Sequence, residues 1–512
     1  MPLLSPVLRP AVHRRSVVGP AIPWPAVAVA VCVLAGVGLR VGAFARNPAL
    51  WGDEAMLALN VVHRPVQALL SPLDLNQGAP AGYLVGCRLL VQAFGGSEWV
   101  LRAPSVAAGL GALALFVPLA YRLFPVRSAR LAVGLFALSP PLVAYSAEFK
   151  QYELDACLTV GLLALGRPVW AAGATRGQLA RLGLAGALAV WFSHPAAFVL
   201  GGLGVALLGD AVARRDRTAL TNRLLVCGVW AVGFLACYLL VTRHLGANPY
   251  LLDYWAGAFW PLPPQGPGDV AWVVHHVLAL FDNPGGFAAA NIGAGGLAAA
   301  CAAVGGVALA DTDRRLLAAL VGPVALALLA SALHKYPFAG RLMLFAVPLL
   351  ILLVAHGAAV LGGLLLQLGP TAGKVAAAAV VGTLCVPVLA ETAAQLKQPL
   401  HAEDTRAGLA HIVKCWQAGD ELVVTNGAGP AVGYYAPLFP LPAENTHLLG
   451  ADRTRFRDEL ARVPRGRLWV LMAHCKPADE AALRALIGGR GVCVDAVTAA
   501  GATVVSCGAG GQ

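Results

Sequence analysis

The sequence predicts a mainly α-helical protein that crosses a membrane many times and carries a small α/β domain at its C-terminal end. Composition is the first reason: 58% of the 512 residues are hydrophobic and 12% are charged, against about 25% charged in soluble proteins. The mean hydropathy is +0.71. Apolar runs long enough to span a bilayer, which takes about 20 residues, recur up to residue 394. From residue 395 onward charges become frequent and short strand-like runs appear.

The apolar runs predict about eleven membrane-spanning helices within residues 22–394, after an N-terminal tail of residues 1–21. The predicted spans are 22–43, 103–121, 131–145, 154–172, 182–194, 196–210, 224–241, 289–310, 316–333, 342–361 and 375–391. The pair 182–194 and 196–210 is short and broken at His194-Pro195, so it is either two tilted helices or a re-entrant hairpin. Ala43-Phe44-Ala45 resembles a signal-peptide cleavage site, but the run before it exceeds a typical h-region of about 7–15 residues. We therefore expect a retained first helix.

Basic residues are concentrated in short connections between the predicted spans and alternate with neutral or acidic loops. Their clusters are Arg9, Arg14 and Arg15; Arg122, Arg127 and Arg130; Arg176 and Arg181; Arg214, Arg215, Arg217 and Arg223; and Arg314 and Arg315. Because positive loops stay in the cytoplasm, this pattern predicts a plasma-membrane protein with a cytoplasmic N-terminus. It also accounts for the net charge of +11 without a nucleic-acid partner. The segments predicted to lie outside are 44–102, 146–153, 242–288 and 334–341.

The first predicted outer loop, 44–102, contains an apolar stretch from Ala81 to Phe94 that Arg88 interrupts. A further span at this point would reverse the orientation of every later basic loop. We therefore expect this stretch to form a helix that lies on the outer membrane surface.

The C-terminal domain, residues 395–512, is expected on the same outer side because the number of predicted spans is odd. Its strands are predicted at 421–425, 467–472 and 502–506, with helices at 404–416 and 478–487. Cys415, Cys475, Cys493 and Cys507 of this domain lack the CxxC spacing of zinc sites. In an extracytoplasmic domain they are candidates for one or two disulfides.

The acidic pair Asp53-Glu54 is the first candidate for an active site, because it lies a few residues after the first long apolar run in a chain that is poor in charge. Four further polar clusters are predicted to lie on the same outer face: Glu148, Lys150 and Tyr152; His194; Lys335, Tyr336 and Arg341; and Arg102 at the mouth of the second span. Ionisable residues at that depth are costly unless they are paired or functional. A carboxylate can take the proton of an acceptor hydroxyl, and Lys and Arg can hold a phosphate leaving group. This chemistry would transfer a sugar from a phosphate-bearing lipid.

Each candidate also has a structural interpretation. Asp53 and Glu54 can favour the N-terminus of a helix that begins near Ala55. Glu148 with Lys150 can be a structural ion pair, and His194 a satisfied polar residue at a helix break. Lys335 and Arg341 can anchor the chain at lipid headgroups, and Arg102 is expected to be structural.

Four segments occur in an order that resembles a known family. They are Asp53-Glu54 followed by Pro80-Ala81-Gly82-Tyr83; Gly95 to Ser105; Tyr145 to Asp155; and Tyr336-Pro337-Phe338 with Arg341. Together they resemble glycosyltransferases of the GT-C superfamily, in the branch of the protein O-mannosyltransferases and lipid A aminoarabinose transferases. The resemblance covers residues 20–390 and implies a bacterial enzyme of the GT-C type. Such an enzyme transfers a sugar from a polyprenyl-phosphate donor in the membrane lipid bilayer to a lipid, glycan or protein acceptor outside.

The resemblance also implies roles for individual residues. Asp53 would be the base or the acceptor-orienting carboxylate, and Glu54 would support it or contact a divalent metal, Mg²⁺ or Mn²⁺. Lys150, Arg341 and Arg102 would contact the donor phosphate. The remaining substrate-binding candidates are Glu148, Tyr152, His194, Lys335 and Tyr336.

Two features depart from the family pattern. Gly52 stands where relatives often carry a larger residue, and Ala79-Pro80-Ala81 replaces a His-Pro-Pro type of run, so the acceptor side is expected to differ.

Two other classes of function are the alternatives. A transporter or flippase for a lipid-linked glycan would place its polar residues near the bilayer midplane, whereas these are predicted at one surface. A structural or sensory protein would not need the combination of Asp53, Glu148, Lys150 and Arg341.

Overall fold

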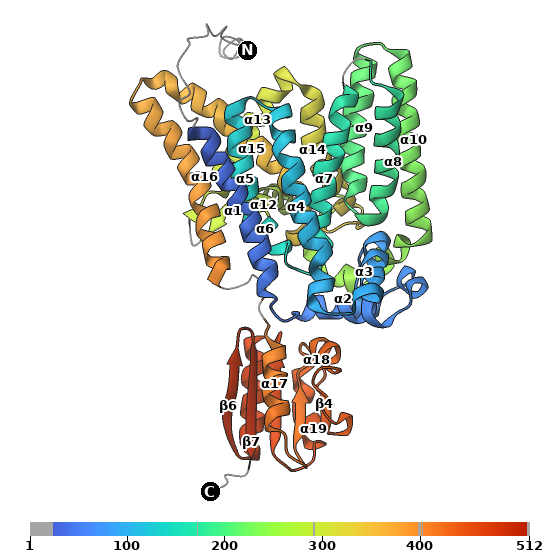
Figure 1. Cartoon of the computed structure of the whole chain (residues 1–512), viewed down its shortest axis with the longest axis vertical. Coiled ribbons are helices and arrows are strands. Elements are labelled where there is room, and N and C mark those ends of the chain that lie inside the picture. The colour runs from blue at the N-terminus through green and yellow to red at the C-terminus, as the bar shows by residue number, and fades with distance from the viewer. Residues whose placement is uncertain (1–23, 171–172, 290–291, 398–400, 402, 509–512) are drawn as a thin grey trace. The chain divides into compact units, whose positions relative to one another are not determined.

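The computed structural model describes residues 24–170, 173–289, 292–397, 401 and 403–508, so the predicted tail 1–21 lies outside the described residues. Helices dominate the chain, and a five-stranded sheet lies near its C-terminal end (Figure 1). The chain divides into two compact units, which are described separately. Unit 1 comprises the residues up to Ala43, Ser105–Ala147 and Gln151–Leu396. Unit 2 comprises Phe44–Pro104, Glu148–Lys150 and Lys397–Gln512.

Unit 1 is a bundle of apolar helices. Its helices are α1 (Trp24–Arg46) and α4 (Glu98–Leu123), which both extend into unit 2, α5 (Val126–Ala137), α6 (Pro140–Tyr145), α7 (Tyr152–Gly166), α8 (Arg176–Phe192), α9 (Ala196–Ala213), α10 (Arg217–Leu240), α11 (Pro249–Tyr254), α12 (Pro267–Asp282), α13 (Gly295–Thr312), α14 (Arg314–Ala332), α15 (Val347–Leu365) and α16 (Ala372–Lys397). Two short strands, β1 (Ala288–Ala289) and β2 (Ile292–Gly293), pair antiparallel. In the bundle α13 packs on α15, α9 on α14 and α8 on α10. The first nine residues of α15 are all buried, so this helix lies in the core.

Eight helices in the described part of the chain are long and apolar enough to cross a membrane. They coincide with eight of the eleven predicted spans. The other three, 131–145, 154–172 and 182–194, correspond to α5, α7 and α8, which have only 12, 15 and 17 residues. Prolines shorten two of them, because Pro140-Pro141 starts a separate helix and Pro168 follows the end of α7. At the predicted break, α8 and α9 are two separate helices on either side of Ser193 to Pro195.

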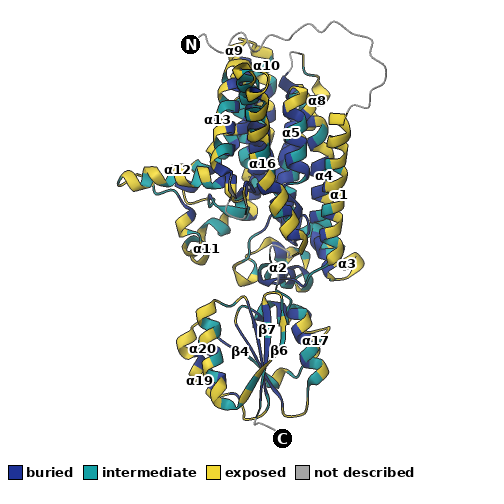
Figure 2. Cartoon of the chain, turned by 90° about the vertical axis from the view of Figure 1, so that its left-hand side faces the viewer, coloured by how far each residue is buried: buried dark blue, intermediate teal, exposed yellow. Residues whose placement is uncertain are grey.

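The outer surface of the bundle is apolar. Figure 2 shows exposed stretches on α1 and α16. Large apolar side chains such as Leu34 of α1, Val232 of α10 and Leu389 of α16 are exposed. A surface of this kind is typical of helices that face lipid. The bundle therefore has the exterior of a multi-pass membrane protein.

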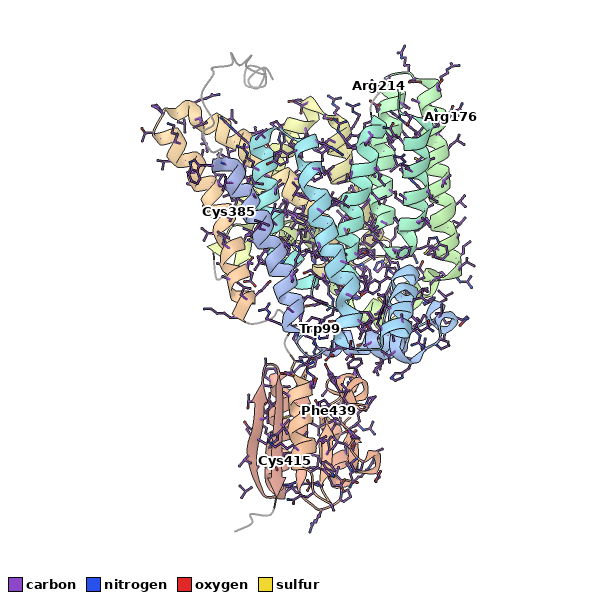
Figure 3. All side chains as sticks on the ribbon, in the orientation of Figure 1. Trp99, Arg176, Arg214, Cys385, Cys415 and Phe439 are labelled. Atoms are coloured by element: carbon purple, nitrogen blue, oxygen red, sulfur yellow. A yellow bond between two sulfur atoms is a disulfide. The ribbon has the colours of Figure 1, made fainter. Side chains whose placement is uncertain are left out.

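Basic residues gather where the predicted cytoplasmic loops are. Arg176 and Arg214 are labelled at the same end of the bundle in Figure 3. Nearby, Asp210 accepts bonds from Arg214 at 2.7 Å, from Arg223 at 2.8 Å and from Arg315 at 3.3 Å. Two predicted cytoplasmic loops thus contribute three arginines to one carboxylate.

A topology assay tests the predicted sidedness of the chain. Alkaline phosphatase fused after Gln395 is expected to be active, because this enzyme folds only outside the cytoplasm and the basic loops are predicted to be cytoplasmic. The same reporter fused after Arg214 should be inactive and serves as the control. An inactive fusion at Gln395 with an active one at Arg214 would reverse the orientation.

The second unit contains a mixed sheet with strand order β4-β3-β5-β7-β6. Its strands are β3 (Glu421–Val424), β4 (Thr446–Leu448), β5 (Leu468–Ala473), β6 (Val492–Ala499) and β7 (Ala502–Gly508). β4, β3 and β5 run parallel, and β7 pairs antiparallel with both β5 and β6. Val470 pairs with Val423 on one side and with Val505 on the other, so these residues lie in the centre of the core.

This unit also contains helices, two in the predicted outer loop and the others in the C-terminal domain. They are α2 (Gly52–His63), α3 (Ala81–Phe94), α17 (Thr405–Cys415), α18 (Gly429–Tyr435), α19 (Phe456–Ala461) and α20 (Pro477–Ile487). The three predicted strands, both predicted tail helices and the helix over Ala81–Phe94 are confirmed. The strands β4 and β6 were not predicted, because β4 has three residues and β6 lies at an exposed edge. That α3 lies on the membrane surface stays a prediction.

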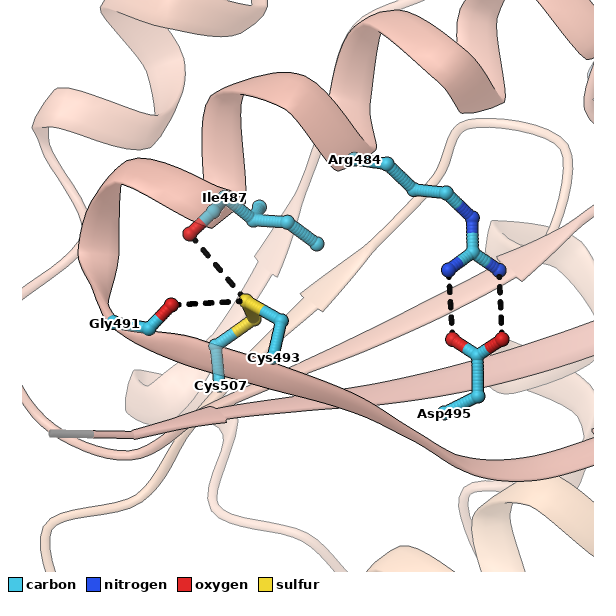
Figure 4. Close-up of a disulfide and its surroundings, with 6 residues drawn as sticks. All are labelled: Arg484, Ile487, Gly491, Cys493, Asp495 and Cys507. Atoms are coloured by element: carbon cyan, nitrogen blue, oxygen red, sulfur yellow. Dashed lines mark hydrogen bonds and ion pairs between the residues drawn. A yellow bond between two sulfur atoms is a disulfide. The ribbon is translucent and has the colours of Figure 1, made fainter. Parts of the chain in front are cut away.

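One of the predicted disulfides is present. Cys493 and Cys507 face each other across β6 and β7 with a Cα–Cα distance of 4.1 Å and are joined (Figure 4). The ion pair between Arg484 of α20 and Asp495 of β6, at 2.6 Å, ties the same edge to a helix. Cys415 and Cys475 are free thiols.

Candidate functional site

Glu54 is fully buried and joins three segments of unit 2. Its carboxylate accepts from Arg102 twice, Nε at 2.9 Å and Nη2 at 2.6 Å, and Arg102 is only 1% exposed. Oε1 also accepts the backbone N–H of Phe149 at 2.5 Å, and Oε2 that of Trp51 at 3.4 Å. Paired bonds between a guanidinium and a carboxylate are strong and directional. Glu54 therefore fixes the start of α2, the start of α4 and the segment 148–150 against each other.

The guanidinium of Arg102 is committed to protein acceptors. Besides Glu54, it donates to Pro48 O at 2.6 Å, Ala49 O at 3.3 Å and Asn47 Oδ1 at 3.4 Å. Together with the two bonds to Glu54, these bonds use every N–H group that an arginine side chain carries. These bonds fit the structural interpretation of Arg102 and leave none of its N–H groups for a donor phosphate.

Asp53 differs from its neighbour in exposure. The helix α2 begins at Gly52, three residues earlier than expected, so both acids lie in its first turn, where the helix dipole favours negative charge. Glu54 is buried, whereas Asp53 is half-buried. Asp53 is therefore the acid of the pair that can meet a substrate.

Glu148 and Lys150 flank the residue that Glu54 holds. Glu148 Oε1 lies 2.7 Å from Nδ1 of His401, and Lys150 Nζ donates to Gln77 Oε1 at 2.9 Å. Both side chains are buried. The unit thus places a buried ammonium and a buried carboxylate on the segment that is fastened to Glu54.

Three residues near Trp51-Gly52 were not among the predicted site residues. Glu403 Oε2 accepts the N–H of Gly52 at 2.8 Å, and its Oε1 lies 2.6 Å from Nδ1 of His474. The ring of His401 stacks on Trp51 at 4.2 Å. The one signal in the sequence was the unusual Gly52. A Cβ there would be in ordinary contact, 3.5 Å from Glu403 and 3.7 Å from the His474 ring, so a side chain larger than that of alanine would meet both residues.

A second network ties the C-terminal part of unit 2 to its outer loop. Arg406 pairs with Glu98 at 2.7 Å, and the Tyr435 hydroxyl donates to the same carboxylate at 3.0 Å while accepting from the N–H of Leu50 at 2.9 Å. Burial, and then the charge of Glu98, raise the pKa of Tyr435. The hydroxyl therefore remains a donor at every physiological pH.

The other predicted site residues belong to unit 1. The guanidinium of Arg341 lies 5.8 Å from the centre of the Tyr152 ring, within the range of a cation–π contact. The Tyr336 hydroxyl donates to Leu342 O at 2.7 Å. His194 lies at the break between α8 and α9, and Lys335 is exposed. Within unit 1, then, Tyr152 and Arg341 come together.

The comparisons concern the fold. No protein-family model and no curated protein matches the sequence. Among solved structures, ArnT from Cupriavidus metallidurans in the apo state matches with a TM-score of 0.53 at 15% identity, over 96% of this chain and 99% of that chain. The same protein bound to undecaprenyl phosphate matches at 0.51 and 15%, over 96% and 100%. The oligosaccharyltransferase AglB from Archaeoglobus fulgidus, in complex with an inhibitory peptide and a dolichol-phosphate, matches at 0.53 and 13%, over 88% and 69%.

The chain has the GT-C fold. This fold confirms the resemblance that the four sequence segments indicated. Sequence identities of 15% and 13% support a shared fold and nothing finer.

Within this fold, Glu54 of the acidic pair does not fit a divalent metal. Both Glu54 oxygens are bonded to Arg102 and to backbone N–H groups. Across the part of the chain that the structure describes, no group of three or more His, Cys, Asp or Glu side chains is arranged to hold a metal ion. We therefore derive no step through Mg²⁺ or Mn²⁺.

Proposed function

We propose that this chain is a membrane glycosyltransferase that moves a sugar from a polyprenyl-phosphate donor to an acceptor outside the cytoplasm. The fold supports the donor class, since one similar structure holds undecaprenyl phosphate and another a dolichol-phosphate. The observation that carries the proposal is the bonding of Glu54. It joins the turn that bears Asp53 to the segment that bears Lys150. A candidate for the acceptor side and one for the phosphate are thereby held in one unit.

The proposed reaction needs both residues. Asp53 orients the acceptor hydroxyl or takes its proton as the oxygen attacks the anomeric carbon of the sugar. The bond from that carbon to the phosphate oxygen breaks, and the polyprenyl phosphate leaves with the electron pair. Lys150 stabilises the charge on the leaving phosphate, which a buried ammonium does well because little water competes.

The predicted residues of unit 1 complete the proposal. Arg341, held against Tyr152, and the neighbouring Tyr336 are proposed to contact the donor, together with His194 and Lys335. Glu54 and Arg102 are positioning residues, because neither has bonding capacity left for a substrate.

Membranes that contain the wild-type chain are expected to transfer label from at least one undecaprenyl-phosphate pentose or hexose, with release of undecaprenyl phosphate. Lys150→Gln should lower kcat/KM for the donor by about 10- to 100-fold, the worth of a hydrogen bond to a charged group. Lys414→Gln, a change to an exposed lysine of α17 outside the proposed site, is the control and should leave kcat/KM for the donor within about twofold. Absence of transfer by the wild type from every such donor would overturn the proposal.

A further inference from the structure

The Glu403–His474 pair is built onto the Asp53 turn. Glu403 uses one oxygen for the N–H of Gly52, the first residue of α2, and the other for Nδ1 of His474. The His474 ring lies within 3.7 Å of the position that a Gly52 side chain would occupy, and 6.3 Å from the centre of the Trp51 ring. The pair therefore lies directly beside the residue that precedes Asp53.

The backbone of His474 is held in an unusual conformation. His474 follows β5 directly and has a φ of +51°, which is uncommon for a residue other than glycine and costs about 1–3 kcal/mol. Gly427, after the neighbouring strand β3, passes so close that a Cβ would meet His474 O at 2.7 Å. Both residues lie at the carboxyl ends of parallel strands, which is where α/β sheets bind their ligands.

The bond to Glu403 determines which ring nitrogen of His474 can accept a proton. An ionised carboxylate only accepts, so Nδ1 of His474 carries the hydrogen and Nε2 has the lone pair. A carboxylate behind the imidazole also stabilises the imidazolium that forms when Nε2 is protonated. Since the side chain is 51% exposed, an acceptor can reach it.

His401 has a similar carboxylate partner but a different environment. Its ring stacks on Trp51 with an interplanar angle of 13°, and its side chain is only 29% exposed. Stacking covers one face of that ring, so His401 is better placed to hold Trp51 than to reach a substrate.

We propose that His474 is a catalytic residue that takes the proton of the acceptor hydroxyl, and that Glu403 positions it. This inference rests on the proposed function and assigns Asp53 the orienting role. The acceptor O–H bond breaks, its proton goes to Nε2 of His474, and the acceptor oxygen forms the new bond to the anomeric carbon. The carbon–phosphate oxygen bond breaks, and polyprenyl phosphate leaves with the electron pair. The imidazolium is neutralised by Glu403 until its proton passes to solvent.

The chain offers a matched control in a second pair of the same chemistry. His447 Nε2 lies 2.7 Å from Glu421 Oε2, and this carboxylate also accepts from Asn445. These residues lie on β3 and β4 and at the turn before β4, with no part in the proposed site. Replacement of His447 therefore removes an equivalent His–Glu pair that has no role in the proposed reaction.

His474→Ala is expected to lower kcat for transfer from the active undecaprenyl-phosphate sugar by about 100-fold or more, the usual share of a general base. Added imidazole should restore part of that loss, because it can occupy the vacated space and take the proton. His447→Ala should stay within about twofold of the wild type. Full turnover by His474→Ala, or a loss that imidazole does not restore, would overturn the inference.

Glu403→Gln provides a second test if His474→Ala does not fold. The amide oxygen can still accept from Gly52, so both KM values should stay within about twofold. Because glutamine carries no charge to stabilise the imidazolium of His474, kcat should fall at least about tenfold. An unchanged kcat would overturn the inference. An active wild type with an unaffected His474→Ala leaves the proposed function standing, whereas an inactive wild type overturns the proposed function itself.

Discussion

Replacement of Arg102 by methionine is expected to destabilise unit 2 by about 3–5 kcal/mol, the usual result of removing one partner of a buried ion pair. Glu54 would be left as a charge without compensation, since it is fully buried. The carbonyls of Pro48 and Ala49 would lose their donor as well. We expect the start of α2 and the segment 148–150 to loosen together, because Glu54 bonds both.

Hydrogen exchange of peptides that cover α2 and residues 148–150 measures this effect in the detergent-solubilised chain. The double variant Arg102→Met with Glu54→Gln should recover part of the loss, because it leaves no charge buried. Arg64→Met is the matched control. Arg64 pairs at 2.6 Å with Asp74 in the same loop, and because the Asp74 side chain is 66% exposed this pair should be worth less than about 1 kcal/mol. Wild-type protection in Arg102→Met would rule out the fastening role of Glu54.

The parts of the fold that were predictable depend on local patterns. Apolar runs and basic loops placed the helices of the bundle, and short strand-like runs placed β3, β5 and β7 in the C-terminal domain. The helices α5 and α7 were overestimated in length, because apolar composition continues across breaks that prolines impose, whereas α8 begins earlier than predicted and is longer than the predicted span 182–194. The edge strand β6 was not predicted, because a strand at an exposed edge does not need a continuous apolar run.

The sequence predicted the residues of the candidate site that lie in loops between the predicted spans, but not those in the C-terminal domain. Asp53 and Glu54 were predicted as site residues because they are charges near a span. That Glu54 is a positioning residue follows only from its bonds to Arg102 and Phe149. The partner Glu403 lies 351 residues from Gly52 in the sequence. No periodicity or spacing reports a contact of that kind, which appears only when the chain folds.

Asp53→Asn is expected to lower kcat for sugar transfer by about 100-fold or more while the protein stays folded. Asparagine has the shape of aspartate but neither accepts a proton nor carries the charge that orients a hydroxyl. Asp53 is half-buried, whereas Glu54 is fully buried and bonded to Arg102. Glu54→Gln should therefore lose activity together with stability, whereas Asp53→Asn should lose activity alone.

Transfer assays and hydrogen exchange on the same preparations separate these two results. Asp74→Asn, a change to an exposed carboxylate of the same loop, should leave kcat within about twofold. Transfer by the wild type is expected to persist in EDTA, because the Glu54 oxygens that a metal would need are already bonded to Arg102. Inhibition by EDTA that Mg²⁺ or Mn²⁺ reverses would assign the acidic pair to a metal instead. Unchanged kcat in Asp53→Asn would remove Asp53 from the reaction and leave the acceptor side to His474.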